Sequence, residues 1–364
     1  MSVFTRVGEP FRRTGQWVKN HRLHTIVTVG VVLIAGAGAS TYFLLSAPLP
    51  LPKVQPIAVA PKPKPPAPKY YSLLDGTQVA SQSDLTAPVT AIMIENTPQA
   101  RPQSGLKQAQ VVYEAIAEGG ITRFMALYQQ NKPQMIGPVR SLRMYYLDWA
   151  APYHPSIVHV GGSLYSLQDV SNGNYRNIDI EHYAGASWRA TDRYAPHNVY
   201  TTFARLDALN SKLGYTSSTF TSFPRVDGQP AATPNASTIN VHMSGPLYDS
   251  QYLYNPATNN YNRYQDGAPH LDREDGQISP SVVIVLKVNM TLVMQDGYRE
   301  DITTTGSGEA DIFQNGTVQT ATWSKAGRMD PLQLLDKNGQ PISLVRGQTW
   351  IVALPNSVGT VSWQ

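Results

Sequence analysis

The pattern of apolar and polar positions first sets apart one long apolar run near the start of the chain. Residues 25–45 are 21 consecutive positions without a charged side chain, which is the length that a helix needs to cross the hydrocarbon core of a membrane. Basic residues gather before this run, and none follows it until Lys53. The positive-inside rule therefore predicts a single-pass anchor, with residues 1–24 in the cytoplasm and the rest of the chain outside the cell.

The same apolar run also fits a signal peptide that is cleaved after export. Ala37, Gly38 and Ala39 form a small-residue sequence of the kind that signal peptidases cut. We favour the anchor because the run is longer than a usual signal core and the basic segment before it is long.

A proline-rich segment follows the apolar run. Residues 48–69 contain nine prolines among 22 residues, with four lysines and no acidic residue. Proline fixes φ and lacks a backbone donor, so this composition favours extended polyproline II structure. We interpret residues 46–86 as a linker that holds the folded part away from the membrane.

Alternating apolar positions begin at about residue 87 and predict strands. Residues 88–95 form one short apolar strand, and residues 111–117 and 122–128 form two more, which Gly119 and Gly120 can join as a hairpin. If Ala117 pairs with Thr122, strand alternation places Glu114, Glu118 and Arg123 on one face of the sheet. Charged side chains at such positions are costly unless they are paired or used.

Two glycine-containing turns lie beyond the hairpin. Gly137 and Pro138 predict the start of a helix that runs to about Ala150, with Arg140 and Arg143 on one side of its first turn. A strand at residues 156–160 then ends in Gly161-Gly162-Ser163 before a short helix at 164–170. Both turns are candidates for holding an anion.

The last third of the chain carries only strand patterns. From Thr238 onward, short extended segments alternate with Asn, Asp, Gly and Pro turns, and Asn-Gly pairs at 315–316 and 338–339 indicate hairpins. The expected fold class is therefore α+β, with a mixed α/β domain at 87–225, a mainly β domain at 236–364, and the anchor and linker before them.

Charge and composition exclude several classes of function. The net charge of +4 comes from the basic residues of the first 69 positions, since residue 70 onward holds 20 basic and 24 acidic residues. A mildly acidic folded region argues against nucleic acid as a partner. The sequence has no cysteine, and its eight histidines show no metal-binding spacing, so we expect no disulfide, no metal and no cofactor.

Several ordered motifs resemble one family. The sequences IENTPQARPQSGLKQAQVVYEAIAEGGITRFMALYQ, IGPVRSLRMYYLDWA, HVGGS and APHNVYTT, followed by YNRYQDGAPHLD and GSGEADIFQNGTVQTATWSKAG, resemble the DUF3048 family of YerB-like envelope proteins over residues 87–364. The resemblance implies a two-domain protein held outside the cytoplasm at the membrane, without an assigned activity or assigned catalytic residues. Many relatives resemble lipoproteins attached through an N-terminal cysteine, which this chain lacks, so the spanning helix would take the place of the lipid.

These observations favour a binding function at a polar, arginine-rich site. We expect the site to hold an anionic envelope ligand, such as a cell-wall glycan, a lipid-linked phosphate or a peptide carboxylate. In this hypothesis arginines contact the anion, glutamates orient the guanidinium groups, and two further residues line the rim. The candidate residues, in that order of role, are Arg101, Arg123, Arg140 and Arg143, then Glu114 and Glu118, then Ser163 and His197.

Alternatives remain open on the sequence alone. The same charges can form a buried ion-pair network in a structural scaffold for a membrane complex. An envelope hydrolase or transferase could use Glu118 or His197, although Glu114 and Glu118 would lie about 13 Å apart on one face, too far for a glycosidase pair. A triad of Ser163, His197 and Asp192 is the weakest alternative, because the sequence around Ser163 lacks the G-x-S-x-G motif.

Overall fold

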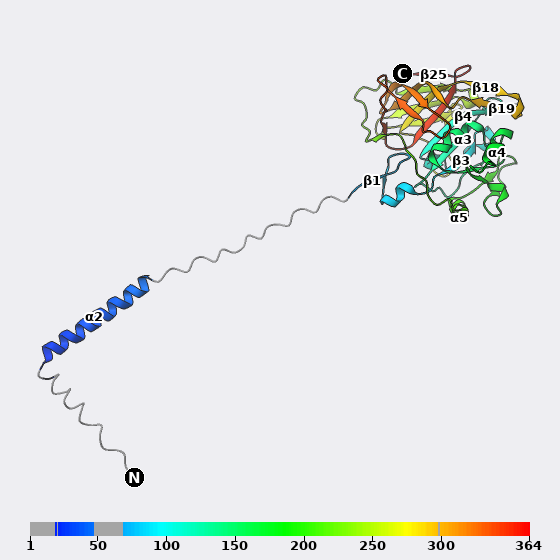
Figure 1. Ribbon diagram of the computed structural model, residues 1–364. Coiled ribbons are helices and arrows are strands. Elements are labelled where there is room, and N and C mark those ends of the chain that lie inside the picture. Colours follow the sequence, from blue (N-terminus) through cyan, green and yellow to red (C-terminus); the bar gives the residue numbers. More distant parts are fainter. Residues whose placement is uncertain (1–18, 20, 47–67, 298) are drawn as a thin grey trace, which may run out of the picture. The chain divides into compact units, whose positions relative to one another are not determined.

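The computed structural model describes residue 19 and residues 21–46, 68–297 and 299–364 (Figure 1). The chain divides into two compact units, residues 1–66 and residues 67–364. Most of the predicted cytoplasmic segment and residues 47–67 of the predicted linker lie outside the described residues. In the first unit, helix α2 (Arg22–Ser46) is long and apolar enough to cross a membrane, and none of its residues is buried.

The second unit is built on one ten-stranded mixed sheet. In spatial order its strands are β22 (Gln333–Leu335), β21 (Thr317–Lys325), β20 (Gly306–Gln314), β17 (Val282–Val288), β24 (Thr349–Pro355), β4 (Val111–Glu118), β5 (Ile121–Tyr128), β3 (Thr90–Glu95), β6 (Ser156–His159) and β7 (Arg176–Asp179). Strands β17, β24, β4, β3, β6 and β7 all run in one direction, so the carboxyl ends of these six strands share one edge of the sheet.

A second sheet has five antiparallel strands. Their order is β14 (Ala268–Pro269), β13 (Asn260–Gln265), β12 (Ser250–Asn255), β11 (Thr238–His242) and β25 (Thr360–Trp363). The remaining strands form two-stranded pairs: β1 (Tyr70–Tyr71) with β2 (Gln78–Val79), β8 (Trp188–Arg189) with β9 (Val199–Tyr200), β10 (Arg225–Val226) with β23 (Leu344–Val345), β15 (Leu271–Asp272) with β16 (Gly276–Gln277), and β18 (Met290–Val293) with β19 (Arg299–Ile302).

Helices are short in the second unit and cover the large sheet on both faces. The α-helices are α3 (Met144–Ala150), α4 (Leu164–Val170) and α5 (Phe203–Leu213). The 3-10 helices are η1 (Gln82–Thr86), η2 (Pro98–Ala100), η3 (Leu106–Gln108), η4 (Ala151–Tyr153), η5 (Ile180–His182), η6 (Pro246–Tyr248) and η7 (Met294–Asp296). One hydrophobic core packs α3 and α4 on one face, and the other packs α5 and the five-stranded sheet on the opposite face.

The expected α+β class is confirmed, but the two sequence regions share one sheet. Five strands of the ten-stranded sheet come from residues 87–225 and five from residues 236–364. Strands β24 and β4 join them, with Thr349 opposite Val111. The expected mixed and mainly β domains are thus parts of one compact unit. This pairing joins residues far apart in the sequence, which local patterns do not reveal.

The hairpin of β4 and β5 has a different register from the one expected. Ile116 pairs with Thr122 and Glu118 with Ile121, so the register shifts at Ala117. An extra residue of this kind interrupts strand alternation. As a result the side chains of Glu114 and Glu118 lie on opposite faces of the sheet, whereas the sequence predicted one shared face.

The predicted helix from Gly137 is also shorter than expected. Residues 137–143 are not helical, and α3 begins only at Met144. The backbone before it is held by other segments, since Arg140 N–H donates to the carbonyl of Met93 and Val139 N–H to that of Val199. Arg140 and Arg143 therefore do not lie on a helix together.

Candidate functional site

Polar side chains gather at the carboxyl edge of the six parallel strands. In open α/β sheets, ligands bind in the crevice outside the carboxyl ends of the strands. At this edge, Glu118 ends β4, Glu95 ends β3, His159 ends β6 and Asp179 ends β7. The structure brings several predicted site residues to this edge but separates them into distinct clusters.

The first cluster joins the tip of the hairpin to the start of α3. Arg123 Nη2 lies 3.1 Å from Glu118 Oε1, and Arg143 Nε donates to Glu118 Oε2 at 3.1 Å. A second nitrogen of Arg143, Nη2, also donates to Oε2. Two further donors reach carbonyls, Arg123 Nη1 on Ser141 at 2.9 Å and Arg143 Nη1 on Leu142 at 2.6 Å. The buried Arg123 Nε has no hydrogen-bond partner among the described residues.

Burial and charge in this cluster indicate a structural role. Only 3% of either guanidinium-bearing side chain is exposed. Burial raises the pKa of Glu118, but the neighbouring Arg123 and Arg143 lower it more, and the pKa is about 2. Burial, together with the charge of Arg123, lowers the pKa of Arg143. The two arginines are thus occupied by one ionised carboxylate.

Glu114 belongs to a closed cluster on the other face of the sheet. Its Oε2 accepts from Arg263 Nη2 at 2.8 Å and from the Trp350 indole at 2.9 Å. Glu114 and Arg263 are both fully buried, and the Arg263 guanidinium lies 4.6 Å from the Trp350 ring centroid. Burial, followed by the charges of Arg263 and Arg101, lowers the pKa of the adjacent His270 well below its usual range. This pair links β13 to the large sheet.

Arg101 is also occupied by the protein itself. It donates to the side chain and the carbonyl of Asn96 at 3.2 and 3.0 Å and to the Leu247 carbonyl at 2.7 Å. Its guanidinium lies over the ring of Tyr248 and 3.7 Å from Asp266. Burial lowers its pKa despite these partners. Arg101 therefore ties the end of β3 to the loop before β12.

The third cluster combines unused hydrogen-bonding capacity with partly exposed side chains. Glu95 is 1% exposed, and its Oε1 lies 2.8 Å from His197 Nδ1 and 3.4 Å from Arg140 Nε. Thr97 Oγ1 also donates to Oε1, at 3.0 Å. Among the described residues, Glu95 Oε2 and Arg140 Nε have no hydrogen-bond partner. A buried polar atom without a partner calls for an explanation, such as a bound water or a ligand.

Arg140 and His197 present their outer atoms toward solvent. Their side chains are 22% and 23% exposed. The one hydrogen bond that the Arg140 side chain donates within the described part of the chain is a long one, 3.4 Å from Nη1 to the Pro196 carbonyl. Of the four predicted arginines, Arg140 thus has the most donors available.

Ser163 has a local role in the turn after β6. It is the N-cap of α4, where its Oγ accepts from the Ser166 N–H, and it is 3% exposed. Ser163 therefore lies buried in this turn and not at the rim of the site, where the sequence analysis placed it. The triad with His197 and Asp192 does not form either, because His197 pairs with Glu95 and Asp192 pairs with Arg273 at 2.7 Å.

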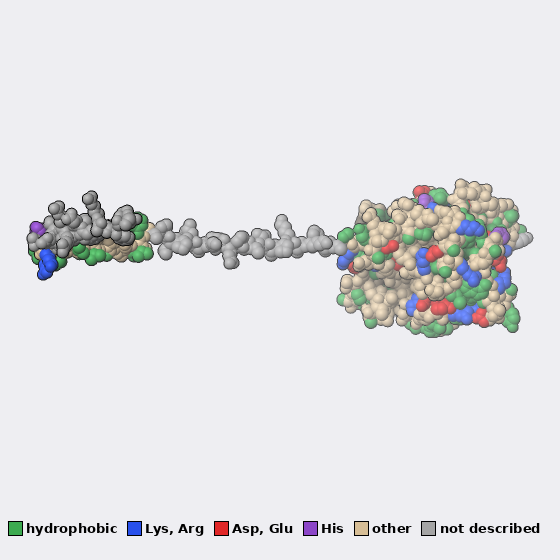
Figure 2. Space-filling model, turned by 90° about the horizontal axis from the view of Figure 1, so that it is seen from below, with side chains coloured by type: hydrophobic (Ala, Val, Ile, Leu, Met, Phe, Trp, Pro, Cys, Tyr) green, Lys and Arg blue, Asp and Glu red, His purple; other side chains and the backbone are tan. Residues whose placement is uncertain are grey.

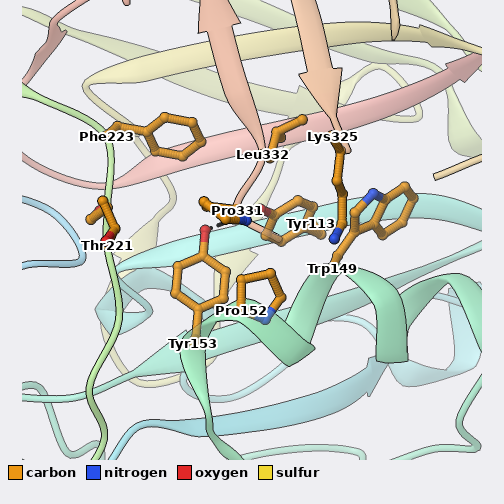
Figure 3. Close-up of a pocket in the computed structure, with 10 residues that line it drawn as sticks. Tyr113, Trp149, Pro152, Tyr153, Thr221, Phe223, Lys325, Pro331 and Leu332 are labelled. Atoms are coloured by element: carbon orange, nitrogen blue, oxygen red, sulfur yellow. Dashed lines mark hydrogen bonds between the residues drawn. The ribbon is translucent and has the colours of Figure 1, made fainter. Parts of the chain in front are cut away.

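One enclosed hollow lies away from this edge. Figure 3 shows Tyr113, Trp149, Tyr153 and Lys325 around it, and its volume of about 10 Å³ is enough for one water. Lys325 Nζ donates to the carbonyls of Gly327, Arg328 and Asp330 at 2.6–2.7 Å. Since an ammonium group has three donors, all are used. Lys325 therefore holds the loop after β21.

Metal and charge-patch functions find little support in the described part of the chain. In it, no group of three His, Asp or Glu side chains could hold a metal ion. On the face of residues 67–364 seen in Figure 2, acidic and basic side chains lie beside one another instead of forming a field of one sign.

The sequence analysis did not identify Glu95 and Arg263 as candidate site residues. Glu95 had a signal, the carboxylate that ends an apolar strand.

Comparisons with known proteins place these features in a family. Residues 74–216 match the family model described as "Protein of unknown function (DUF3048) N-terminal domain", and residues 239–351 match its C-terminal domain. The chain is similar to a Bacillus subtilis protein named "Putative lipoprotein YerB", with 31% identity over 298 residues, which cover 80% of this chain and 88% of the relative. It also resembles the crystal structure of YerB from Bacillus subtilis, with a TM-score of 0.72, 27% identity, and coverage of 81% of this chain and 100% of the other.

Proposed function

The chain belongs to the DUF3048 family, and from that premise we propose that it is a membrane-anchored envelope protein that binds an anionic ligand through Arg140 and His197. Two observations support the anchor: the relative named as a lipoprotein and the apolar helix α2. The chain contains no cysteine to carry a lipid. A single pass through the membrane by α2 would leave residues 67–364 outside the cytoplasm.

The observation that carries the binding proposal is the arrangement of the Arg140 and His197 side chains around one buried carboxylate. Glu95 holds His197 Nδ1 and lies close to Arg140 Nε. The outer nitrogens of both side chains lie in the partly exposed part of the cluster. A guanidinium fork matches the geometry of a phosphate or carboxylate.

The unpartnered oxygen of Glu95 indicates which functional groups the ligand should carry. Oε2 is an acceptor without a donor in the described part of the chain, and satisfying a buried acceptor of this kind contributes about 1–3 kcal/mol. A ligand with a hydroxyl group beside its negative group would satisfy both Arg140 and Glu95. Wall polymers built from sugar or polyol phosphates have this chemistry.

A binding titration tests the proposal. The full chain, purified in a polyoxyethylene detergent, is titrated by calorimetry with glycerol phosphate and with N-acetylmuramic acid. We expect at least one of these probes to bind, and Arg140→Ala to weaken binding about tenfold, or 1.4 kcal/mol. The matched control is Arg205→Ala, which removes an exposed arginine on α5 and should leave binding unchanged. Unchanged binding by Arg140→Ala would remove its role.

A catalytic function for His197 is the second candidate. A histidine whose Nδ1 faces a carboxylate and whose Nε2 is free has the arrangement of a general base. Within the described residues, His197 Nε2 has no hydrogen-bond partner, and Glu95 supplies the carboxylate. Glu118 fits such chemistry less well, because two guanidinium groups keep it ionised. Turnover of muropeptides or phosphodiesters that is lost in His197→Gln would favour this candidate.

A structural scaffold is the outcome that remains if no small ligand binds. The occupied clusters around Glu118 and Glu114 are consistent with that role, since such ion pairs join elements without chemistry. In that case cross-linking in cells should recover a protein partner, and neither glycerol phosphate nor N-acetylmuramic acid should bind.

A further inference from the structure

The outer face of the five-stranded sheet has an unusual composition for an exposed surface. Its inner face is buried, as Ile239, Tyr252 and Tyr261 show. Because side chains alternate along a strand, the outer face carries the side chains between these positions. They are mostly amides, hydroxyls and one aromatic ring: Asn240 and His242 on β11, Gln251 and Leu253 on β12, Asn262 and Tyr264 on β13, and Thr360 and Ser362 on β25.

Three of these side chains form a row across adjacent strands. Asn240 pairs with Gln251 in the register of β11 and β12, and Gln251 pairs with Tyr264 in that of β12 and β13. Gln251 Nε2 donates to Asn240 Oδ1 at 2.7 Å, which fixes the orientation of both amides. The row lines a hollow of about 250 Å³ at the protein surface. This volume is slightly below the range of pockets for drug-sized ligands, roughly 300–1,000 Å³.

The ring of Tyr264 is available to a ligand. Among the described residues, it stacks on no other aromatic ring or cation, and its hydroxyl has no hydrogen-bond partner. Tyrosines in this sheet that serve packing are buried instead, as Tyr252 and Tyr261 are. An aromatic ring with one apolar face and one polar end suits a ligand with the same two characters.

The charges around the hollow do not favour an anion as its occupant. Its one acidic side chain, Asp249, lies beside its one histidine, with His242 Nδ1 2.7 Å from Asp249 Oδ1. No Lys or Arg lines it. The free amide and imidazole atoms offer both donors and acceptors in fixed positions, which is what a polyhydroxylated ligand requires.

From these observations we infer that the outer face of the five-stranded sheet is a second binding site, for an uncharged saccharide. The ring of Tyr264 stacks on the apolar face of a sugar ring, while Asn240, Gln251 and the pair of His242 and Asp249 bind its hydroxyl groups. This site differs in residues and in charge from the one at Arg140. It does not depend on the proposed anion binding.

Saturation-transfer NMR on the full chain tests this inference. The protein is kept in a polyoxyethylene detergent, because a detergent with a sugar head group would compete for the site. The probe is chitotetraose, which is uncharged. Maltotetraose tests for selectivity, and N-acetyl-trialanine amide tests whether an uncharged peptide binds instead. We expect chitotetraose to bind with a Kd of about 1 mM or below.

Variants assign the binding to the row. Tyr264→Ala and Gln251→Ala should each weaken chitotetraose binding about tenfold, whereas Tyr264→Phe, which keeps the ring, should stay within about threefold. Thermal unfolding shows whether each variant is folded. Arg140→Ala should leave saccharide binding unchanged, which separates this inference from the proposed function. The inference is overturned if no saccharide binds at about 10 mM, if only the peptide binds, or if folded Tyr264→Ala and Gln251→Ala bind like the unchanged protein.

Discussion

The carboxylate of Glu95 lies 2.8 Å from the imidazole Nδ1 of His197, although 102 positions separate the two residues in the sequence. Glu95 ends a central strand, and His197 lies in the irregular segment before β9. The contact brings His197 to the carboxyl edge of the sheet beside Arg140. The proposed anion site depends on this relationship, because one buried carboxylate fixes the positions of both Arg140 and His197.

Replacing Glu95 tests whether it positions the other two residues. Glu95→Gln keeps the size of the side chain but removes its charge. The charge of Glu95 is already balanced by Arg140, so we expect the lost orientation to outweigh any reduced repulsion of an anion. Affinity for the anionic probe that binds should fall about threefold to tenfold in calorimetry. Equal or stronger binding would show that Glu95 does not position Arg140 and His197.

Glu118 should make stability depend on pH in the acid range. Its pKa is lowered from 4.5 to about 2 in the folded protein, so its ion pairs stabilise the fold above the unfolded pKa and lose their effect as pH falls toward 2. The contribution at neutral pH is about 3 kcal/mol at most. Urea unfolding should show Glu118→Gln less stable at pH 7, with a difference that shrinks between about pH 4.5 and pH 2.

A control variant separates the effect of the Glu118 ion pairs from the general loss of stability at acid pH. Glu309→Gln removes an exposed carboxylate on β20, so its stability difference from the unchanged protein should stay small at every pH. If the difference for Glu118→Gln stays constant from pH 7 to pH 3, Glu118 is not held ionised by Arg123 and Arg143.

How much the sequence predicts can be judged from the hairpin. The two strands and the Gly119-Gly120 turn are present, because their patterns are local. The prediction that Glu114 and Glu118 share one face was wrong, because a single register shift at Ala117 puts them on opposite faces. A one-residue irregularity leaves almost no signal in the composition, yet it reverses the face of every later side chain on the strand.

Long-range pairing explains most of the other differences. Glu114 contacts Arg263, which lies 149 positions later in the sequence. Strand β4 lies beside β24, which is more than 200 positions away. Residues 137–143 contain helix-forming patterns, but hydrogen bonds to Met93 and Val199 keep them extended. Tertiary contacts of this kind override local propensity. The sequence could name the polar residues but not their partners.

The buried pair of Glu114 and Arg263 should be the most sensitive point of the fold. Arg263→Met leaves the Glu114 carboxylate in a closed interior with only neutral donors, and losing one partner of a buried pair costs about 3–5 kcal/mol. Chemical denaturation of the full chain measures this loss. The double variant Glu114→Gln with Arg263→Met should lose less than the sum of the two single variants, because the residues share one interaction.

An exposed pair is the matched control for this prediction. Arg273 and Asp192 lie 2.7 Å apart with side chains 37% and 49% exposed, and exposed pairs of this kind contribute about 0–1 kcal/mol. Arg273→Met should therefore cost far less than Arg263→Met. Similar losses in the two variants would contradict the assignment of Arg263 to a closed interior.

Arginine side-chain NMR tests the central claim most directly, because it follows each guanidinium during a titration. The full chain carries ¹⁵N-labelled arginine and is titrated with whichever anionic probe binds in calorimetry, while Arg140→Lys identifies the Arg140 Nε–H signal. We expect the Arg140 signal to shift with added probe, and the signals of Arg123 and Arg143 to stay in place because both side chains are buried against Glu118. A shift of Arg123 and Arg143 without Arg140, or no arginine shift at all, would contradict an anion site at the carboxyl edge.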